Sequence, residues 1–219
     1  MARAYIERHI HTLTLAHACF QLGARMRTTS HITGMSHAEL CKFYLPGENA
    51  FHAGRLPASP DWLMAKTNCL DRAELSVFAA ILQRVLAQGI APGDALIGAY
   101  RLYAGSCAVQ PRVSFDRAFD VACHLKGIWT HRTASIALYA CPRCGSYNLS
   151  SIGDEKLLNR GCVFCRLLAR YEKDPRVRAG FPKRRRPGSS SRAGGLPRML
   201  AGAYGSESTT AISSLRPEI

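Results

Sequence analysis

The 219-residue chain is long enough for one large domain or two small ones, and 47% hydrophobic content is sufficient for a buried core. Its 29 lysines and arginines against 15 acidic residues give a formal charge of +14, which favours a polyanionic partner, with nucleic acid ahead of an anionic membrane surface. Residues 9–24 lack acidic and basic residues, but this run contains three histidines and is too short and polar to span a bilayer. We expect a soluble, cytoplasmic protein with no membrane partner.

The first 127 residues have the pattern of an all-α domain, because apolar residues recur every three or four positions in several segments. Ser36 with Glu39 indicates a capping box, and Asp71 with Glu74 indicates the start of another helix. Pro92 suits the first position of a helix. We expect a loop at residues 45–60 and helices at about residues 5–28, 36–45, 71–89, 92–105 and 114–126.

After residue 127 short apolar runs stand beside two cysteine pairs, which predicts a small β-containing unit over residues 128–170. Each pair has the spacing CxxC, and seventeen residues separate the two pairs. Two sulfurs of one tight turn reach the same ion, and a second turn completes a tetrahedron. Such spacing is typical of a four-cysteine zinc site, with one Zn²⁺ per chain. The predicted ligands are Cys141, Cys144, Cys162 and Cys165.

We interpret this site as structural, because four thiolates fill the coordination shell and leave no position for an activated water. A redox role of the CxxC pairs would require a thioredoxin-like βαβ setting, which the sequence does not have. A zinc enzyme is not expected either: the sequence has no HExxH, no deaminase HxE with PCxxC, and no carboxylate cluster. His131 is considered only as a surplus ligand, and His124 draws no functional assignment.

The last segment, residues 171–219, is rich in arginine, glycine, serine and proline. We interpret it as a basic, low-complexity tail that is disordered. The expected fold class is therefore mainly α: a helical N-terminal domain (1–127), a small β-containing four-cysteine zinc unit (128–170) and this tail. The free cysteines outside the two pairs are interpreted as small buried hydrophobic residues.

Several short words in this order resemble the FlhC family of flagellar transcriptional activator subunits. They are LGAR (22–25), GRLPASPDW (54–62), AYRLY (99–103), FDRAF (115–119) and the paired CxxC motifs. The resemblance covers roughly residues 5–168. The family's zinc ligands match the four cysteines one for one, whereas the tail is longer and richer in arginine and serine than the family pattern.

The resemblance implies a transcriptional activator, not an enzyme, that works in a heterohexamer of four FlhD and two FlhC subunits. It implies binding to upstream promoter DNA of class II flagellar operons and recruitment of RNA polymerase. An RNA-binding zinc-ribbon protein is the alternative, because the basic charge does not distinguish the two nucleic acids. Trp62, Tyr100 and Tyr103, which lie in the family words, are interpreted as core or interface residues.

Two places in the sequence are candidates for DNA contact. The segment 26–44 partly matches a helix-turn-helix, with Gly34 at the turn but Thr29 where such motifs prefer an apolar residue. In this hypothesis His37 and Lys42 face the groove while Arg25 and Arg27 contact phosphates; an ordinary capped helix is the alternative. The second candidate is the zinc unit, where Arg160, Arg166 and Arg170 with the basic tail contact phosphates; a merely solvated tail is the alternative.

Overall fold

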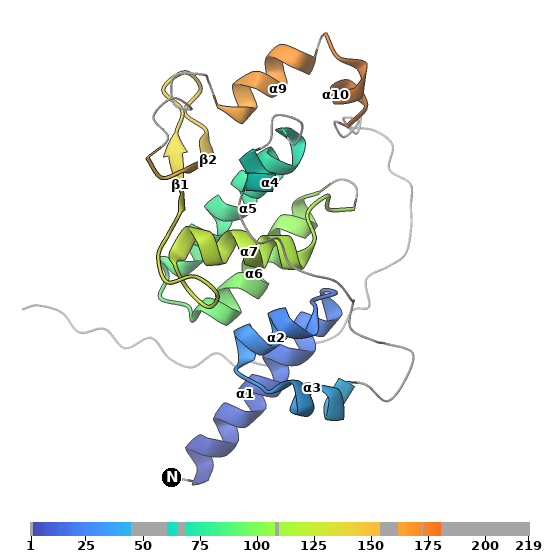
Figure 1. Ribbon diagram of the computed structural model, residues 1–219, viewed down its shortest axis with the longest axis vertical. Coiled ribbons are helices and arrows are strands. Elements are labelled where there is room, and N and C mark those ends of the chain that lie inside the picture. The colour runs from blue at the N-terminus through green and yellow to red at the C-terminus, as the bar shows by residue number, and fades with distance from the viewer. Residues whose placement is uncertain are drawn as a thin grey trace, which may run out of the picture. The chain divides into compact units, whose positions relative to one another are not determined.

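The computed structural model describes residues 2–44, 61–64, 69–107, 110–153, 162–171 and 173–180. Over these ranges the protein is mainly helical, as predicted, and contains an antiparallel two-stranded sheet (Figure 1). None of the helices in these ranges is long and apolar enough to cross a bilayer. The loop predicted at 45–60 and the tail beyond residue 180 lie outside the described residues.

The N-terminal segment forms three helices, α1 (Ala2–Gln21), α2 (Met26–Thr33) and α3 (His37–Tyr44). The single helix predicted over residues 5–28 is wrong beyond Gln21, because the chain turns at Gly23 with φ 72°. The N–H groups of Gly23 and Ala24 donate to the carbonyls of Phe20 (2.9 Å) and Cys19 (3.0 Å). This is the pattern of a Schellman motif, in which glycine ends a helix at low conformational cost.

A short turn containing Gly34 (φ 74°) separates α2 from α3. The predicted capping box is confirmed: the Glu39 N–H donates to Ser36 Oγ (3.3 Å), and the Ser36 N–H donates to Glu39 Oε2 (2.8 Å). Buried Met35 and Leu40 pack together with Ala16 of α1. The three helices therefore share a small core of their own.

The main core is built by α5 (Cys69–Leu86), α6 (Pro92–Ser106) and α7 (Phe115–Lys126), with the short α4 (Asp61–Met64) beside α5. The predicted starts of α6 at Pro92 and of α7 after Ser114 are confirmed. The two tyrosines of the AYRLY word are buried, as predicted. Tyr100 donates its hydroxyl to the carbonyl of Val113 (2.8 Å), and Tyr103 donates to Glu74. Both polar tips are thus satisfied inside the core.

The start of α5 differs from the prediction. The helix begins at Cys69, so Asp71 and Glu74 lie inside its first turns rather than forming a cap. Glu74 instead accepts from Tyr103 and from the backbone N–H of Arg112 (3.2 Å), while Asp71 pairs with the Arg112 side chain (3.1 Å). These two carboxylates therefore anchor the segment before α7, a role that local spacing does not indicate.

The sheet consists of β1 (Ile136–Ala140) and β2 (Tyr147–Ser151), close to the predicted runs, with Leu138 opposite Leu149. The backbone of Leu149 is held by side chains of α5. Its N–H donates to Ser76 Oγ (3.0 Å), and its carbonyl accepts from Arg72 Nη2 (2.6 Å) and Nε (3.0 Å). Because α5 satisfies this edge of β2, the hairpin is fixed to the helical core.

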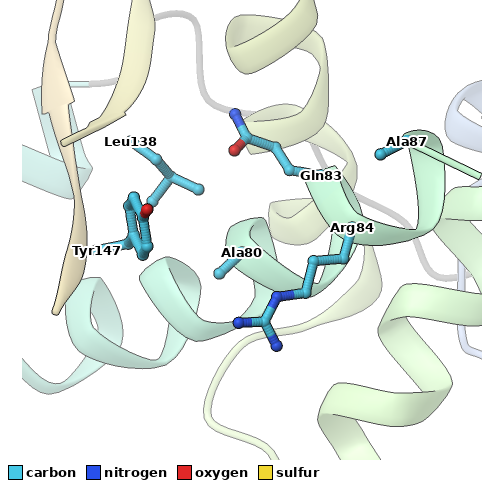
Figure 2. Close-up of a pocket in the computed structure, with 6 residues that line it drawn as sticks. All are labelled: Ala80, Gln83, Arg84, Ala87, Leu138 and Tyr147. Atoms are coloured by element: carbon cyan, nitrogen blue, oxygen red, sulfur yellow. The ribbon is translucent and has the colours of Figure 1, made fainter. Parts of the chain in front are cut away.

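A hollow of about 330 Å³ lies between α5 and the hairpin (Figure 2). Leu138 and Tyr147 of the strands face α5 across it, and Ala80, Gln83 and Arg84 of α5 line the opposite side (Figure 2). Its lining contains no cysteine, histidine or carboxylate. The lining residues are Ala80, Gln83, Arg84, Ala87, Leu138 and Tyr147.

Candidate metal centre and nucleic-acid interface

The first cysteine pair lies in the turn that joins β1 to β2. Cys141 directly follows β1, and its N–H donates to the carbonyl of Ser146 (2.9 Å). Gly145 has φ 71°, and its N–H donates to the carbonyl of Cys141 (2.8 Å), which closes the knuckle. The glycine beside this knuckle therefore supplies the left-handed conformation that the turn requires. Gly161, beside the other pair, lies outside the described residues.

The second pair lies at the start of α9 (Val163–Tyr171), a helix that the sequence analysis did not predict. The N–H of Cys165 donates to Cys162 Sγ (3.4 Å), and the N–H of Arg166 donates to the Cys162 carbonyl (3.1 Å). Free N–H groups and the dipole at a helix N-terminus favour negative charge, and so favour thiolates. A further helix, α10 (Pro175–Gly180), lies in the segment that was expected to be disordered.

The fold brings the four sulfurs together. Cys141 Sγ lies 3.9 Å from Cys165 Sγ, and Cys144 Sγ lies 3.4 Å from Cys162 Sγ. All four lie within 4.8 Å of one another. A tetrahedron with Zn–S bonds of about 2.3 Å has S–S edges of about 3.8 Å, so the cluster has the dimensions of a four-thiolate centre. The donor set can hold a metal ion and is consistent with zinc.

The electrostatics of the four cysteines also favour a bound cation. Backbone N–H groups of Cys144 and Arg143 lower the pKa of Cys141 to about 6, whereas burial raises the pKa of Cys162 to about 12. Four thiolates at these distances repel one another, so a bound cation is needed for all four to lose their protons. The arrangement offers no open coordination position once four sulfurs are used.

The metal unit is packed against the same helix that holds the hairpin. Val163 and Leu167 of α9 are buried with Cys69 and Ala73 of α5, and Leu70 and Phe164 pack at the edge of this cluster. The amphipathic face of α9 begins between the two cysteines of the second pair. Binding of an ion at the cysteines and packing of α9 on α5 therefore support each other.

The candidate DNA-contacting residues fall into different environments. Arg27, His37 and Lys42 are exposed on α2 and α3. Arg25 is half-buried instead: its backbone N–H donates to Asp116 Oδ1 (3.0 Å) and its Nε lies 3.5 Å from Asp116 Oδ2. Arg25 therefore has a structural partner on α7 that the sequence did not reveal.

Residues 26–44 form two helices and a turn, which is the local arrangement that the helix-turn-helix hypothesis requires and that ordinary capped helices also have. Thr29, the apparent mismatch, is fully buried, and its hydroxyl donates to the carbonyl of Arg25 (3.1 Å). Phe43, which follows Lys42 on α3, is 50% exposed. The outer side of α3 thus combines basic residues with one exposed aromatic ring.

In the zinc unit, Arg166 is half-buried and Arg170 is exposed, both on α9. Arg160 lies outside the described residues. Lys173, Arg176 and Arg178 are also exposed and continue the basic surface toward α10. All three residues lie in the segment 171–219 that was predicted to be a tail.

A second group of ligand-type side chains was missed. Asp120, His124 and His131 lie close together around the end of α7. Burial raises the pKa of Asp120 and lowers the pKa of His124 to about 4. His131 belongs to this group and not to the four cysteines. No sequence spacing marks the three residues as a set, because His131 reaches the helix only through the fold of the following loop.

A basic, mainly helical protein with a four-cysteine metal centre on its core is typical of nucleic-acid-associated zinc proteins rather than of metalloenzymes. Comparison with known families is more specific. The sequence model of the family described as "Flagellar transcriptional activator (FlhC)" matches residues 1–178, and the chain therefore belongs to this family. A search among curated proteins gives no match. The recognition made from the short sequence words is confirmed.

Proposed function

We propose that this chain is the zinc-containing, DNA-contacting subunit of an activator of class II flagellar operons, acting with FlhD and recruiting RNA polymerase. The observation that carries the proposal is the family match over residues 1–178, which spans the helical core, the α2–α3 pair and the four cysteines. Cys141, Cys144, Cys162 and Cys165 are proposed to hold one structural Zn²⁺. When bound, the ion cross-links the hairpin turn to the start of α9.

The proposed DNA-reading element is α3. Its capping box fixes the helix start, and its inner residue Leu40 is completely buried, so the helix is held firmly while His37 and Lys42 remain exposed. We propose that these two side chains meet the major groove and that Arg27 contacts phosphate. Arg25 keeps its place in the proposal as a phosphate contact only through its outer guanidinium nitrogens, because its Nε faces Asp116.

The basic side of the zinc unit is proposed as the second, sequence-independent contact. Arg166 and Arg170 lie on one helix that is docked by the metal centre, and Arg160 and the tail extend the same charge along the chain. Basic residues that neutralise phosphates release counterions, so their contribution falls as salt rises. Zinc loss would remove this contact by releasing α9.

The proposed contact with FlhD is the N-terminal half of α1. Tyr5, Ile6 and Ile10 are 67%, 55% and 57% exposed, which leaves an apolar stripe on a helix. A stripe of this kind is typical of a subunit interface. Ile6→Asp with Ile10→Asp should prevent copurification with FlhD, whereas Leu168→Asp, at an equally exposed apolar residue of α9, should not. Unchanged copurification of the double variant would exclude this surface.

The function is tested by copurifying the full chain with FlhD and footprinting a class II flagellar promoter, with structured RNA as competitor. We expect promoter protection that RNA does not displace. Arg27→Ala, at the proposed phosphate contact, should lower affinity and reduce the salt slope by about 1, whereas Lys126→Ala, at an exposed lysine at the end of α7, should not. His37→Ala should cost about 1–3 kcal/mol and relax specificity at one base pair. No protection, or displacement by RNA, would overturn the proposal in favour of an RNA-binding protein.

A further inference from the structure

Three metal-ligand side chains outside the cysteine centre converge at the C-terminal end of α7. Asp120 and His124 lie one helical turn apart, each only 4% exposed, with Asp120 Oδ1 3.9 Å from His124 Nε2. The ring of His131, from the following loop, stacks on His124 with centroids 3.7 Å apart. One ligand atom from each residue lies within 4.8 Å of the others. The chain thus holds one carboxylate and two imidazoles at a single buried point.

The hydrogen bonds around the cluster leave its centre unsatisfied. His124 Nδ1 is paired with Ser135 Oγ at 2.7 Å, while its Nε2 is buried and has no hydrogen-bond partner among the described residues. Asp120 Oδ2 accepts from Trp62 Nε1 (3.4 Å). Metal-bound histidines and carboxylates are commonly oriented by such outer bonds, which leave the other nitrogen or oxygen for the ion. A buried polar atom without a partner is otherwise costly.

The loop that contains His131 folds back against the end of α7. Gly127 ends α7 with φ 64°, and a Cβ at this position would lie 2.8 Å from the backbone N of Ala134 and from the backbone C of Thr133. The N–H of Ser135 donates to the carbonyl of His124 (2.9 Å), and this bond fixes the loop on the helix. The close approach at Gly127 therefore positions both His131 and the Ser135 hydroxyl.

We propose that Asp120, His124 and His131 form a second metal site, for a divalent transition ion of the zinc class. Two nitrogens and one carboxylate favour such ions over magnesium or calcium, which prefer all-oxygen sites. Three protein ligands leave the fourth position to water, and the half-exposed His131 forms the solvent side of the site. To form a tetrahedral site with metal–nitrogen bonds of about 2.0–2.1 Å, the ligand atoms move together by less than about 1.5 Å, to edges of roughly 3.3 Å. The His131 ring also turns out of its stack on His124, because a bound ion lies in the plane of each imidazole. This site is independent of the function proposed above.

The test uses the full chain with one equivalent of zinc already in the cysteine centre, titrated with Co²⁺ and followed by absorption and metal analysis. We expect a second equivalent whose spectrum lacks the thiolate-to-cobalt charge-transfer band that exchange into the cysteines would produce. Binding should also raise the melting temperature. His131→Gln should abolish the second equivalent because it removes one of the three ligands, and the half-exposed loop position of His131 lets the variant fold normally. Ser135→Ala should weaken it about 10- to 100-fold.

The matched control is His17→Gln, the same substitution at an exposed histidine of α1, which should keep the second equivalent. A wild-type chain that binds no second equivalent would overturn the proposal and leave the cluster as a buried polar contact between Asp120 and His124. Equal binding by wild type and His131→Gln would overturn it as well, because the ion would then lie elsewhere. Circular dichroism of His131→Gln distinguishes lost ligation from lost folding, and Ser135→Ala supplies an independent measurement.

Discussion

The two clusters of ligand-type side chains are assembled in opposite ways. The cysteine centre consists of two local turns, each with its own CxxC spacing, that need only be brought together. The group of Asp120, His124 and His131 has no such spacing, and it exists because a loop folds back over α7. We therefore expect metal binding at the first cluster to organise the structure around it, whereas the residues of the second cluster are placed by structure that is already present.

The sharpest test of this difference is removal of the first centre. Cys141→Ser should abolish zinc binding and unfold α9, because in structural sites the metal binding energy, about 10–16 kcal/mol in zinc-finger peptides, is also folding energy. The amides of β2 should keep partial protection, since Arg72 and Ser76 still hold Leu149. Zinc analysis and hydrogen exchange measure both effects. Cys41→Ser, outside the cluster, is the control, and full zinc content in Cys141→Ser would contradict the assignment.

The second cluster should depend on the backbone at Gly127. Gly127→Ala forces a Cβ against the returning loop and should cost about 3 kcal/mol in the free energy of unfolding, with loss of the His131 position. Gly34→Ala is the matched control: its φ of 74° is similar, but nothing lies within 4 Å of the added Cβ, so about 1 kcal/mol is expected. Urea unfolding measures both variants. Equal costs would show that the close approach has no energetic importance.

A smaller loss of stability is expected where the hairpin is attached to helix α5. Arg72→Met removes both donors from the buried carbonyl of Leu149 and should lower the free energy of unfolding by about 2 kcal/mol, while zinc stays bound. Arg84→Met, at an exposed position of the same helix, should change it by less than about 0.5 kcal/mol. If Arg72→Met also released zinc, the cysteine centre would depend on the core more than its local turns indicate.

Much of the helical part could be predicted from the sequence, because caps and periodicity act locally. The Ser36 and Glu39 box and the Pro92 start are such signals, and both are confirmed. The end of α1 was missed because apolar residues continue with helical spacing through Gly23, although this glycine was the available stop signal.

Other features of the fold depend on contacts between residues far apart in the sequence, which local spacing does not indicate. The α9 helix begins inside a metal motif and packs its apolar face on α5. The amphipathic spacing of its nine residues was the available signal, and it was missed because the segment was assigned to the β-containing unit. Asp71 and Glu74 had the spacing of a cap but serve the segment before α7. The four cysteines could be predicted as a set from their CxxC spacing, and the fold brings their sulfurs within 4.8 Å of one another; their role as zinc ligands remains a prediction. The DNA-contact assignments remain predictions, with Arg25 now given a partner in the core.

The contact between Arg25 and Asp116 joins two of the sequence motifs that resemble the family. Arg25 closes LGAR and Asp116 lies in FDRAF, 91 positions later; the Asp116 carboxylate accepts from the Arg25 N–H (3.0 Å) and from the Thr28 hydroxyl (2.6 Å). The start of α2 is therefore capped by a residue from another helix. In a chimaera that exchanges residues 1–44 between relatives, α2 would keep its orientation on α7 only if the chimaera also has a carboxylate at position 116. Two motifs that lie far apart in the sequence therefore form one contact in the fold.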